Sequence, residues 1–365
     1  MTGAMYAAIS GLKSHMQKLN VIGNNIANVN TYGYKSARTT FQESLYTTLT
    51  GGSNGTATVG GVNPSQIGYG CSLGTIDLDM STKNYSPTGN GMDCMINGDG
   101  FFMVGNKPAM GADGKLATVE AKDLTLTRVG NFKFDSQGYL VDGQGNVVYG
   151  FVTQSGTTTA GVIADADKPT VSTQLVPIRL PMAAGIPADA AAGPAEGTAL
   201  YPGVTAGELG VYPTVDAKGN ALQSIQADSI QIDGATGKIT AVNKADSKTV
   251  VVGYIAMASV SNPNGVSHIS GPYYRAGEGA GECSAASIGG AVTGYLNNLA
   301  ADAANAKSIK NTGKTELITG GLESSGTDLA TEISEMITTQ RGYQANTRIV
   351  TVTDSMLEEL VNMKR

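Results

Sequence analysis

Both ends of this chain carry apolar residues at the spacing of an α-helix. In each stretch the repeat alternates steps of four and three residues, which places one narrow apolar stripe along a helix, as in helices that pack on other helices at shallow angles. The N-terminal stripe consists of Met5, Ile9, Leu12, Met16, Leu19, Gly23 and Ile26. The C-terminal stripe consists of Leu329, Ile333, Met336, Gln340, Tyr343, Thr347 and Val350, and is extended by Met356, Leu357, Leu360, Val361 and Met363.

The two stripes predict that the ends of the chain come together as a coiled-coil-like helical stem. We expect a first helix from Thr2 to about Ala27 and a last helix that begins near Asp328. Isolated helices of this length gain most of their stability from packing, so we expect further copies of the chain to cover the stripes. The stripes are therefore predicted to be polymer interfaces.

The long middle of the chain is predicted to be β-structure. Short apolar runs alternate with turn pairs such as Asn97-Gly98 and Asp142-Gly143. The predicted strands cover residues 101–104, 124–127, 132–134, 147–149, 229–233, 238–240 and 250–254. The segment 182–210 is rich in Ala, Gly and Pro and is predicted to be a loop-rich insertion.

These elements predict an α+β fold that is mainly β, with nested β-rich domains between the paired terminal helices. We expect residues 1–35 and 321–365 to form the terminal helical core. Residues 36–152 and 255–320 would form a discontinuous middle β-domain, and residues 153–254 an outer inserted β-domain.

The composition argues against nucleic acid and membrane partners. A net charge of -6 and an isoelectric point near 5.0 do not provide the concentrated basic surface that nucleic acid requires. No apolar run approaches the roughly 18 residues needed to span a bilayer. The start MTGAMYAAIS lacks the basic and apolar segments of a signal peptide, so export would need a different route.

The residues that usually carry catalysis or bind metals are few and scattered. His15 and His268 are the two histidines, and the adjacent Ser267 and His268 lack a third orienting group. Cys71, Cys94 and Cys283 are odd in number and are expected to be small buried residues, although a disulfide between Cys71 and Cys94 stays open. The sequence predicts no enzyme activity, no metal site and no cofactor.

Short motifs at both ends resemble those of bacterial flagellar rod and hook proteins. The N-terminal motif contains Asn24, Asn25, Ala27, Asn28, Asn30, Thr31, Gly33, Tyr34 and Lys35. The C-terminal motif contains Gln340, Arg341, Tyr343 and Asn346. Between them, residues 100–104, 128–132 and 138–141 are similar to the middle domain of the same family, whereas residues 155–225 match no family motif.

The resemblance implies a structural subunit of the flagellar hook, a curved and flexible tube that transmits torque from the motor to the filament. It implies self-assembly, contacts with the distal rod protein, the hook cap and the hook–filament junction proteins, and a location outside the cell. It also implies export by the flagellar type III apparatus without a cleaved signal peptide, and Phe41 with Leu45 is similar to its export signal. A packing role for Phe41 is an equal alternative. A distal rod subunit is the near alternative function, and a secreted adhesin or surface protein is the remote one.

Overall fold

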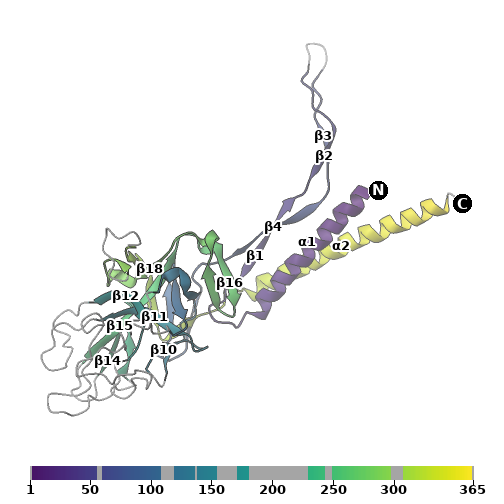
Figure 1. Ribbon diagram of the computed structural model, residues 1–365. Coiled ribbons are helices and arrows are strands. Elements are labelled where there is room, and N and C mark those ends of the chain that lie inside the picture. Colours follow the sequence, from purple (N-terminus) through teal and green to yellow (C-terminus); the bar gives the residue numbers. More distant parts are fainter. Residues whose placement is uncertain are drawn as a thin grey trace, which may run out of the picture. The chain divides into compact units, whose positions relative to one another are not determined.

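The computed structural model describes residues 2–55, 60–107, 119–135, 138–153, 171–180, 229–242, 249–296 and 307–363. The chain divides into two compact units (Figure 1). The terminal unit comprises residues 1–79 and 325–365, and the β unit comprises residues 80–324. The described elements confirm an α+β fold that is mainly β.

The terminal unit is built around two long helices. Helix α1 covers Thr2–Ala27 and helix α2 covers Leu329–Asn362, which confirms both predicted helices. The Asp328 side chain caps α2 by accepting a hydrogen bond from the Ala330 N–H at 3.1 Å. The helices run antiparallel, so both ends of the chain lie at the same end of this unit (Figure 1).

A twisted two-stranded ribbon completes the terminal unit. Strand β1 (Ala37–Glu43) pairs with β4 (Cys71–Leu78), and further along the ribbon β2 (Tyr46–Thr50) pairs with β3 (Ser65–Gly68). The ribbon meets α1 closely at Gly70, where a Cβ would lie 2.0 Å from the Ser10 Oγ and φ is +101°. Residues 36–79 thus lie in the same compact unit as the helices, whereas the sequence predicted them to be part of the middle β-domain.

Thirteen strands form the main sheet in the described part of the β unit. Its principal path has the order β13-β14-β15-β11-β7-β8-β17-β16. Off this path, β10 and β12 pair with β11, β18 pairs with β15, β9 pairs with β10, and β19 pairs with β18. The strands are β7 (Phe101–Gly105), β8 (Thr125–Thr127), β9 (Lys133–Phe134), β10 (Leu140–Val141), β11 (Val147–Thr153), β12 (Val171–Pro177), β13 (Gln231–Ile232), β14 (Lys238–Val242), β15 (Thr249–Val260), β16 (Val266–Ser270), β17 (Tyr273–Ala276), β18 (Cys283–Ser287) and β19 (Lys310–Asn311).

Two further strand pairs of the β unit form small sheets of their own. Strand β6 (Cys94–Asn97) pairs with β20 (Glu316–Thr319), and β5 (Tyr85–Pro87) pairs with β21 (Gly321–Glu323). The β unit therefore joins strands from the beginning and the end of its own chain segment, since residues 85–97 pair with residues 316–323.

Apolar side chains from the central strands form one continuous core. Phe102 and Phe132 meet edge to face with their ring centroids 5.0 Å apart, and Val148, Ile255 and Met257 are buried around them. Most of the apolar runs that were predicted as strands supply residues to this core.

Some predictions fall on parts of the chain that the structure does not describe. The Ala/Gly/Pro-rich segment 182–210 lies outside the described residues, so the division into a middle and an outer β-domain stays a prediction. Cys94 and Cys283 are buried and Cys71 is half-buried, and all three are free thiols, so no disulfide joins Cys71 to Cys94.

Candidate assembly interface

The two helices of the terminal unit meet through small residues. A Cβ at Gly11 would lie 2.7 Å from the Asn346 Nδ2, and a Cβ at Gly342 would lie 2.9 Å from the His15 ring. Each helix therefore places a polar side chain over a glycine of the other helix. This reciprocal packing explains the close approach of α1 and α2.

Further polar contacts join the antiparallel helices toward the end of α1 and the start of α2. Lys18 Nζ lies 3.0 Å from Glu335 Oε2, and the Asn25 Nδ2 donates a hydrogen bond to Glu332 Oε1 at 2.8 Å. The Lys18–Glu335 pair is partly exposed and contributes little to stability, whereas Asn25 is 1% exposed. The contact between the helices is thus mainly small and polar.

The apolar stripes are rotated away from this contact. On α1 the buried positions are Ala8, Gly11, Ser14, Ile22 and Asn25, and all of them except Ser14 come one residue before a stripe position. One residue turns a helix by roughly 100°, so the stripe faces a different direction from the buried positions. Ile333 is 45% exposed and Met16 is 50% exposed.

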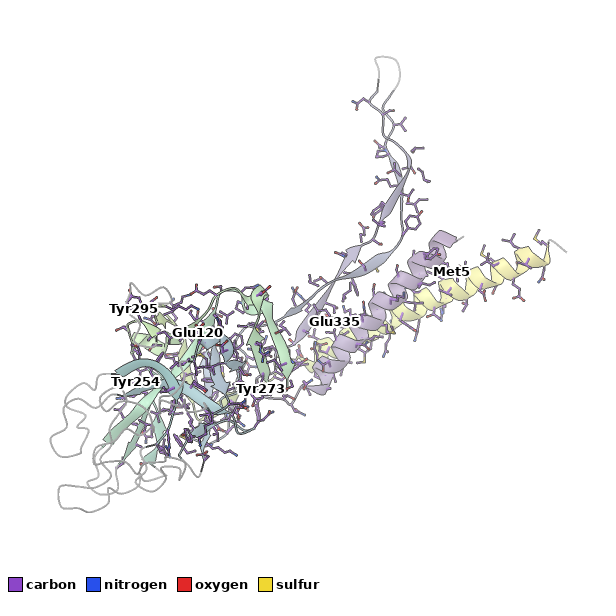
Figure 2. All side chains as sticks on the ribbon, viewed as in Figure 1. Met5, Glu120, Tyr254, Tyr273, Tyr295 and Glu335 are labelled. Atoms are coloured by element: carbon purple, nitrogen blue, oxygen red, sulfur yellow. The ribbon has the colours of Figure 1, made fainter. Side chains whose placement is uncertain are left out.

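The sequence-predicted stripe residues divide into two groups by exposure. Met5, Ile9, Leu12, Leu19, Ile26, Met336 and Val350 are half-buried. Met16, Gly23, Leu329, Ile333, Gln340, Tyr343, Thr347, Met356, Leu357, Leu360, Val361 and Met363 are exposed. Most of the C-terminal stripe is therefore exposed, and the pairing of the two helices through their stripes stays a prediction. Figure 2 shows the side chains along both helices, including Met5 and Glu335.

The N-terminal motif builds the turn that follows α1. The Asn28 Nδ2 donates to the Asn24 backbone O at 2.9 Å, and the Thr31 Oγ1 donates to the Asn28 Oδ1 at 3.1 Å. Gly33 then adopts a positive φ of 67°, which favours glycine, and Lys35 is buried. These residues direct the chain from α1 into β1.

Asn25 connects three parts of the terminal unit. Its Oδ1 accepts hydrogen bonds from the Ala37 N–H at 3.0 Å and from the Tyr34 hydroxyl at 3.0 Å. Its Nδ2 donates to the Ala37 backbone O at 2.9 Å as well as to Glu332. Asn25 therefore joins the end of α1, the start of β1 and the first turn of α2, and its place in the motif has a structural reason.

The C-terminal motif is mostly exposed. Asn346 is half-buried against Gly11, whereas Gln340, Arg341 and Tyr343 are exposed on α2. The part of this motif that contacts α1 is therefore one residue, and the rest is available to other molecules.

The ribbon carries a second set of exposed apolar residues. Leu45 is 80% exposed and Leu49 is 61% exposed, and no charged residue occurs between Glu43 and Asp77. A two-stranded ribbon is marginally stable by itself, and proteins usually protect open strand edges with charges. This surface was not predicted from the sequence, although the long uncharged stretch was a signal for it.

The two residues of the predicted export signal have different environments. The Phe41 ring packs edge to face on the His15 ring at 5.8 Å between centroids, and Lys18 Nζ lies 5.9 Å above it. Leu45 lies between β1 and β2 and is 80% exposed. Phe41 therefore has a packing contact in the folded chain, and Leu45 does not share it.

Burial shifts the pKa values of two groups at the helix contact. Partial burial and the nearby Lys18 ammonium lower the pKa of His15, and its Nδ1 has no hydrogen-bond partner among the described residues. Burial raises the pKa of Glu332, and the hydrogen bond from Asn25 opposes this shift. The helix contact thus contains a neutral imidazole near neutral pH.

The described residues contain no group of three or more His, Cys, Asp or Glu side chains that could hold a metal ion. In the same part of the chain, neither helix combines the length and apolar character needed to span a bilayer.

Comparison with known proteins matches both ends of the terminal unit. Residues 5–35 match the family model described as flagella basal body rod protein. Residues 318–363 match the model described as flagellar basal body rod FlgEFG protein C-terminal. The first match contains α1 and the turn built around Asn25, and the second contains α2.

Relatives with rod and hook names align with the whole chain or with part of it. The flagellar basal-body rod protein FlgG of Bacillus subtilis is 34% identical over 365 residues, covering 100% of both chains. The flagellar hook protein FlgE of Rhizobium meliloti is 27% identical and covers 100% of this chain and 99% of its own. The FlgE of Borreliella burgdorferi is 35% identical over 39% of this chain and 29% of its own length. This chain belongs to the family of flagellar rod and hook proteins, the structural proteins of the flagellar axis.

Proposed function

We propose that this chain is the subunit of the flagellar hook and that it polymerises with copies of itself. The observation that carries self-assembly is the offset between the buried helix faces and the apolar stripes. The helices already contact each other through Gly11, Gly342 and Asn25, so the exposed stripe residues need a surface from another molecule.

Neighbouring subunits would bury these stripes. A fully enclosed Leu, Ile or Met side chain contributes roughly 1.5–3 kcal/mol, so several residues such as Ile333, Leu357 and Leu360 would together favour association strongly. The uncharged ribbon would be covered in the same assembly, because its edges offer unpaired backbone groups. The half-buried stripe residues, such as Leu12, would extend the contact.

The assignment to the hook is supported by the long segment between β11 and β15. Strand β11 ends at Thr153 and β15 begins at Thr249, so about a hundred residues are inserted in the β unit. A distal rod subunit is expected to be shorter in this region. The full-length similarity to the Rhizobium hook protein is consistent with this proposal.

A distal rod subunit is the second candidate function. It is favoured by the similarity to the Bacillus protein named as a rod protein, which extends over the full length of both chains at a higher identity. Both candidates share the self-assembling terminal unit and differ in the mechanical property of the tube.

A hook subunit must allow bending while it carries torque. The helical cores would form the part of the tube that is continuous along its axis. The β units would lie outside it, where the β units of neighbouring subunits move closer together on the inner side of the curve. Charged residues make up only 15% of the chain, so few ion pairs between subunits would have to break when surfaces slide. The distal rod protein, the hook cap and the junction proteins would be its partners.

We further propose that the flagellar type III apparatus exports the chain without cleavage to a position outside the cell. The export apparatus would recognise Phe41 and Leu45 in the unfolded chain, since Phe41 is packed on His15 after folding. This order allows Phe41 to serve both export and folding.

Electron microscopy of flagella distinguishes the two candidates. The chain is expressed in a strain lacking its own copy, and hook–basal bodies are purified and labelled with an antibody against the β unit. Label along a curved tube supports the hook subunit. Label confined to a straight segment below the hook supports the rod subunit and rejects the hook.

Single substitutions test the stripes as polymer contacts. Ile333→Asp should leave the secreted monomer folded, because Ile333 is exposed, and should abolish tubes because a buried carboxylate without a partner costs several kcal/mol. Thr338→Asp places the same charge on an exposed position of α2 off the stripe and is the matched control. Normal tubes from Ile333→Asp would show that the stripe faces solvent in the polymer.

A further inference from the structure

The β unit is connected to the rest of the chain by two peptide links, at residues 79–80 and 324–325. The segments just inside these links are held against each other. The Ser324 N–H donates to the Asn84 backbone O at 2.9 Å, and β21 pairs with β5 so that Glu323 lies opposite Tyr85. The incoming and outgoing segments therefore form one short antiparallel pair.

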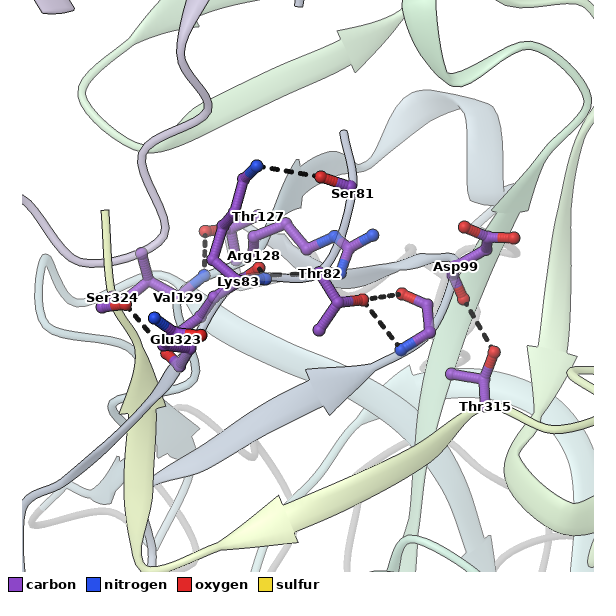
Figure 3. A network of polar contacts seen from close by, with 12 residues as sticks. Ser81, Thr82, Lys83, Asp99, Thr127, Arg128, Val129, Thr315, Glu323 and Ser324 are labelled. Atoms are coloured by element: carbon purple, nitrogen blue, oxygen red, sulfur yellow. Dashed lines mark hydrogen bonds and ion pairs between the residues drawn. The ribbon is translucent and has the colours of Figure 1, made fainter. Parts of the chain in front are cut away.

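A buried carboxylate is attached to this pair. Glu323 is 1% exposed, and its Oε1 accepts a hydrogen bond from the Lys83 N–H at 2.8 Å. Lys83 in turn donates from its Nζ to the Ser81 Oγ at 2.9 Å. Figure 3 shows Glu323 between the incoming segment and Arg128.

The opposite charge comes from the main sheet. Arg128 follows β8 and is 2% exposed, and its Nη1 lies 3.9 Å from Glu323 Oε2. Its guanidinium also lies 5.4 Å from the centre of the Phe101 ring. Within the described residues its Nε and Nη1 donate no hydrogen bond, and burial lowers the pKa of the guanidinium. The pair is therefore expensive to bury and not ideally bonded.

Stability alone does not explain such a pair. Replacement of a buried ion pair by apolar residues of similar size is often neutral or stabilising, whereas a buried ion pair can select one arrangement among alternatives. Strands β5 and β21 are each only three residues long, so their backbone bonds specify the pairing weakly. A slip of one residue would turn the side chain of Glu323 to the opposite face of its strand.

We propose that the Arg128–Glu323 pair is a register lock that fixes the outgoing strand β21 against the incoming strand β5. The lock acts with Gly321, where a Cβ would lie 2.4 Å from the Ser86 backbone O. Any force that this subunit transmits along its chain enters and leaves the β unit through these two segments. A fixed register gives that unit one defined attachment, in a hook or in a rod.

Hydrogen exchange on the full-length protein tests this role. The variants are Arg128→Met, Glu323→Leu and the double substitution, and Glu316→Gln is the matched control because Glu316 is an exposed glutamate on the neighbouring β20. Each single substitution should lower the urea midpoint, since it leaves one buried charge without its partner. The double variant should return to the native midpoint or exceed it, but peptides 83–87 and 321–324 should exchange at least ten-fold faster.

Peptides 101–105 and 125–127 should exchange at the native rate in the double variant, as should all peptides of Glu316→Gln. Native exchange in peptides 83–87 and 321–324 of the double variant would overturn the proposal. So would a double variant that is as unstable as the single variants or does not fold, because the pair would then be needed for stability. Equal acceleration in Glu316→Gln would also overturn it.

Discussion

Asn25 and Glu332 are 307 positions apart, and the amide of one donates to the carboxylate of the other at 2.8 Å. This contact joins the last turns of α1 to the first turn of α2. The same amide holds both backbone groups of Ala37, so the start of the ribbon depends on it as well. One side chain of the N-terminal motif thus determines where three elements meet.

Asn25→Ala should destabilise the terminal unit by about 1–3 kcal/mol, because it leaves the partly buried N–H and C=O groups of Ala37 without the Asn25 side chain as a partner. The loss is measured by urea unfolding followed by helical circular dichroism, since both long helices lie in this unit. Asn24→Ala is the control, because Asn24 is exposed and donates to the Tyr34 hydroxyl at 3.2 Å. Equal losses in the two variants would contradict the role assigned to Asn25.

The sequence predicted those elements whose signals are local. The helices are predicted by the apolar period, the Asn-rich stop after Ala27 and the cap at Asp328. Strands β7, β11 and β15 are predicted by apolar runs next to turns. The ribbon was missed because Tyr46–Thr50 and Ser65–Gly68 are exposed on all sides and show no alternation of apolar and polar residues. Strands that are exposed on both faces lack the alternation of apolar and polar residues by which a strand is recognised in a sequence.

The sequence also identified apolar stripes without showing what they contact. Which helix face is buried depends on Gly11 and Gly342, since these positions decide how closely the backbones approach. That is a property of two helices together, and neither stripe contains the information. For the same reason Asn25 could be assigned to a motif, but the three residues that its side chain bonds became evident only in three dimensions.

Two helical glycines should respond oppositely to alanine. A Cβ at Gly23 meets nothing within 4 Å, so Gly23→Ala should stabilise the terminal unit by about 0.5–1 kcal/mol through helix propensity. A Cβ at Gly342 would press on the His15 ring at 2.9 Å, so Gly342→Ala should lose this gain or destabilise the unit. Thermal unfolding of the two variants measures the difference. A larger gain for Gly342→Ala would refute the close approach at His15.

The ribbon should be required for assembly and dispensable for folding. Leu49→Lys changes a side chain that is 61% exposed, so the monomer should keep its stability, while tubes should be lost because the lysine would be buried against a neighbouring subunit. Leu49→Met keeps the size and apolar character and should assemble normally. Electron microscopy of both variants in a strain without its own copy gives the result, and normal tubes from Leu49→Lys would mean that the ribbon stays in solvent.

The export role of Leu45 can be separated from folding. Leu45→Ala should reduce the amount of protein secreted at equal expression, yet leave urea unfolding unchanged because Leu45 is 80% exposed. Phe41→Ala should lower both quantities, since it also removes the contact with His15. Ser44→Ala, beside Leu45, is the control. Unchanged secretion of Leu45→Ala, measured by immunoblot of the medium, would remove these residues from the export signal.

The helix contact should weaken as the pH falls below neutrality. Burial and the Lys18 ammonium lower the pKa of His15 in the folded chain, whereas an unfolded histidine titrates near 6.5. Between these two values the unfolded chain binds more protons, so stability decreases with falling pH and the loss is complete below the folded pKa. The salt-bridged Glu335 partly neutralises Lys18, and Glu332 titrates in the opposite sense because burial raises its pKa. Urea unfolding of the helices between pH 7.5 and 5.5 should therefore show a smaller pH dependence in His15→Gln than in the native protein. His268→Gln, which lies in the β unit, should keep the native dependence, and a native slope in His15→Gln would assign the effect to another group.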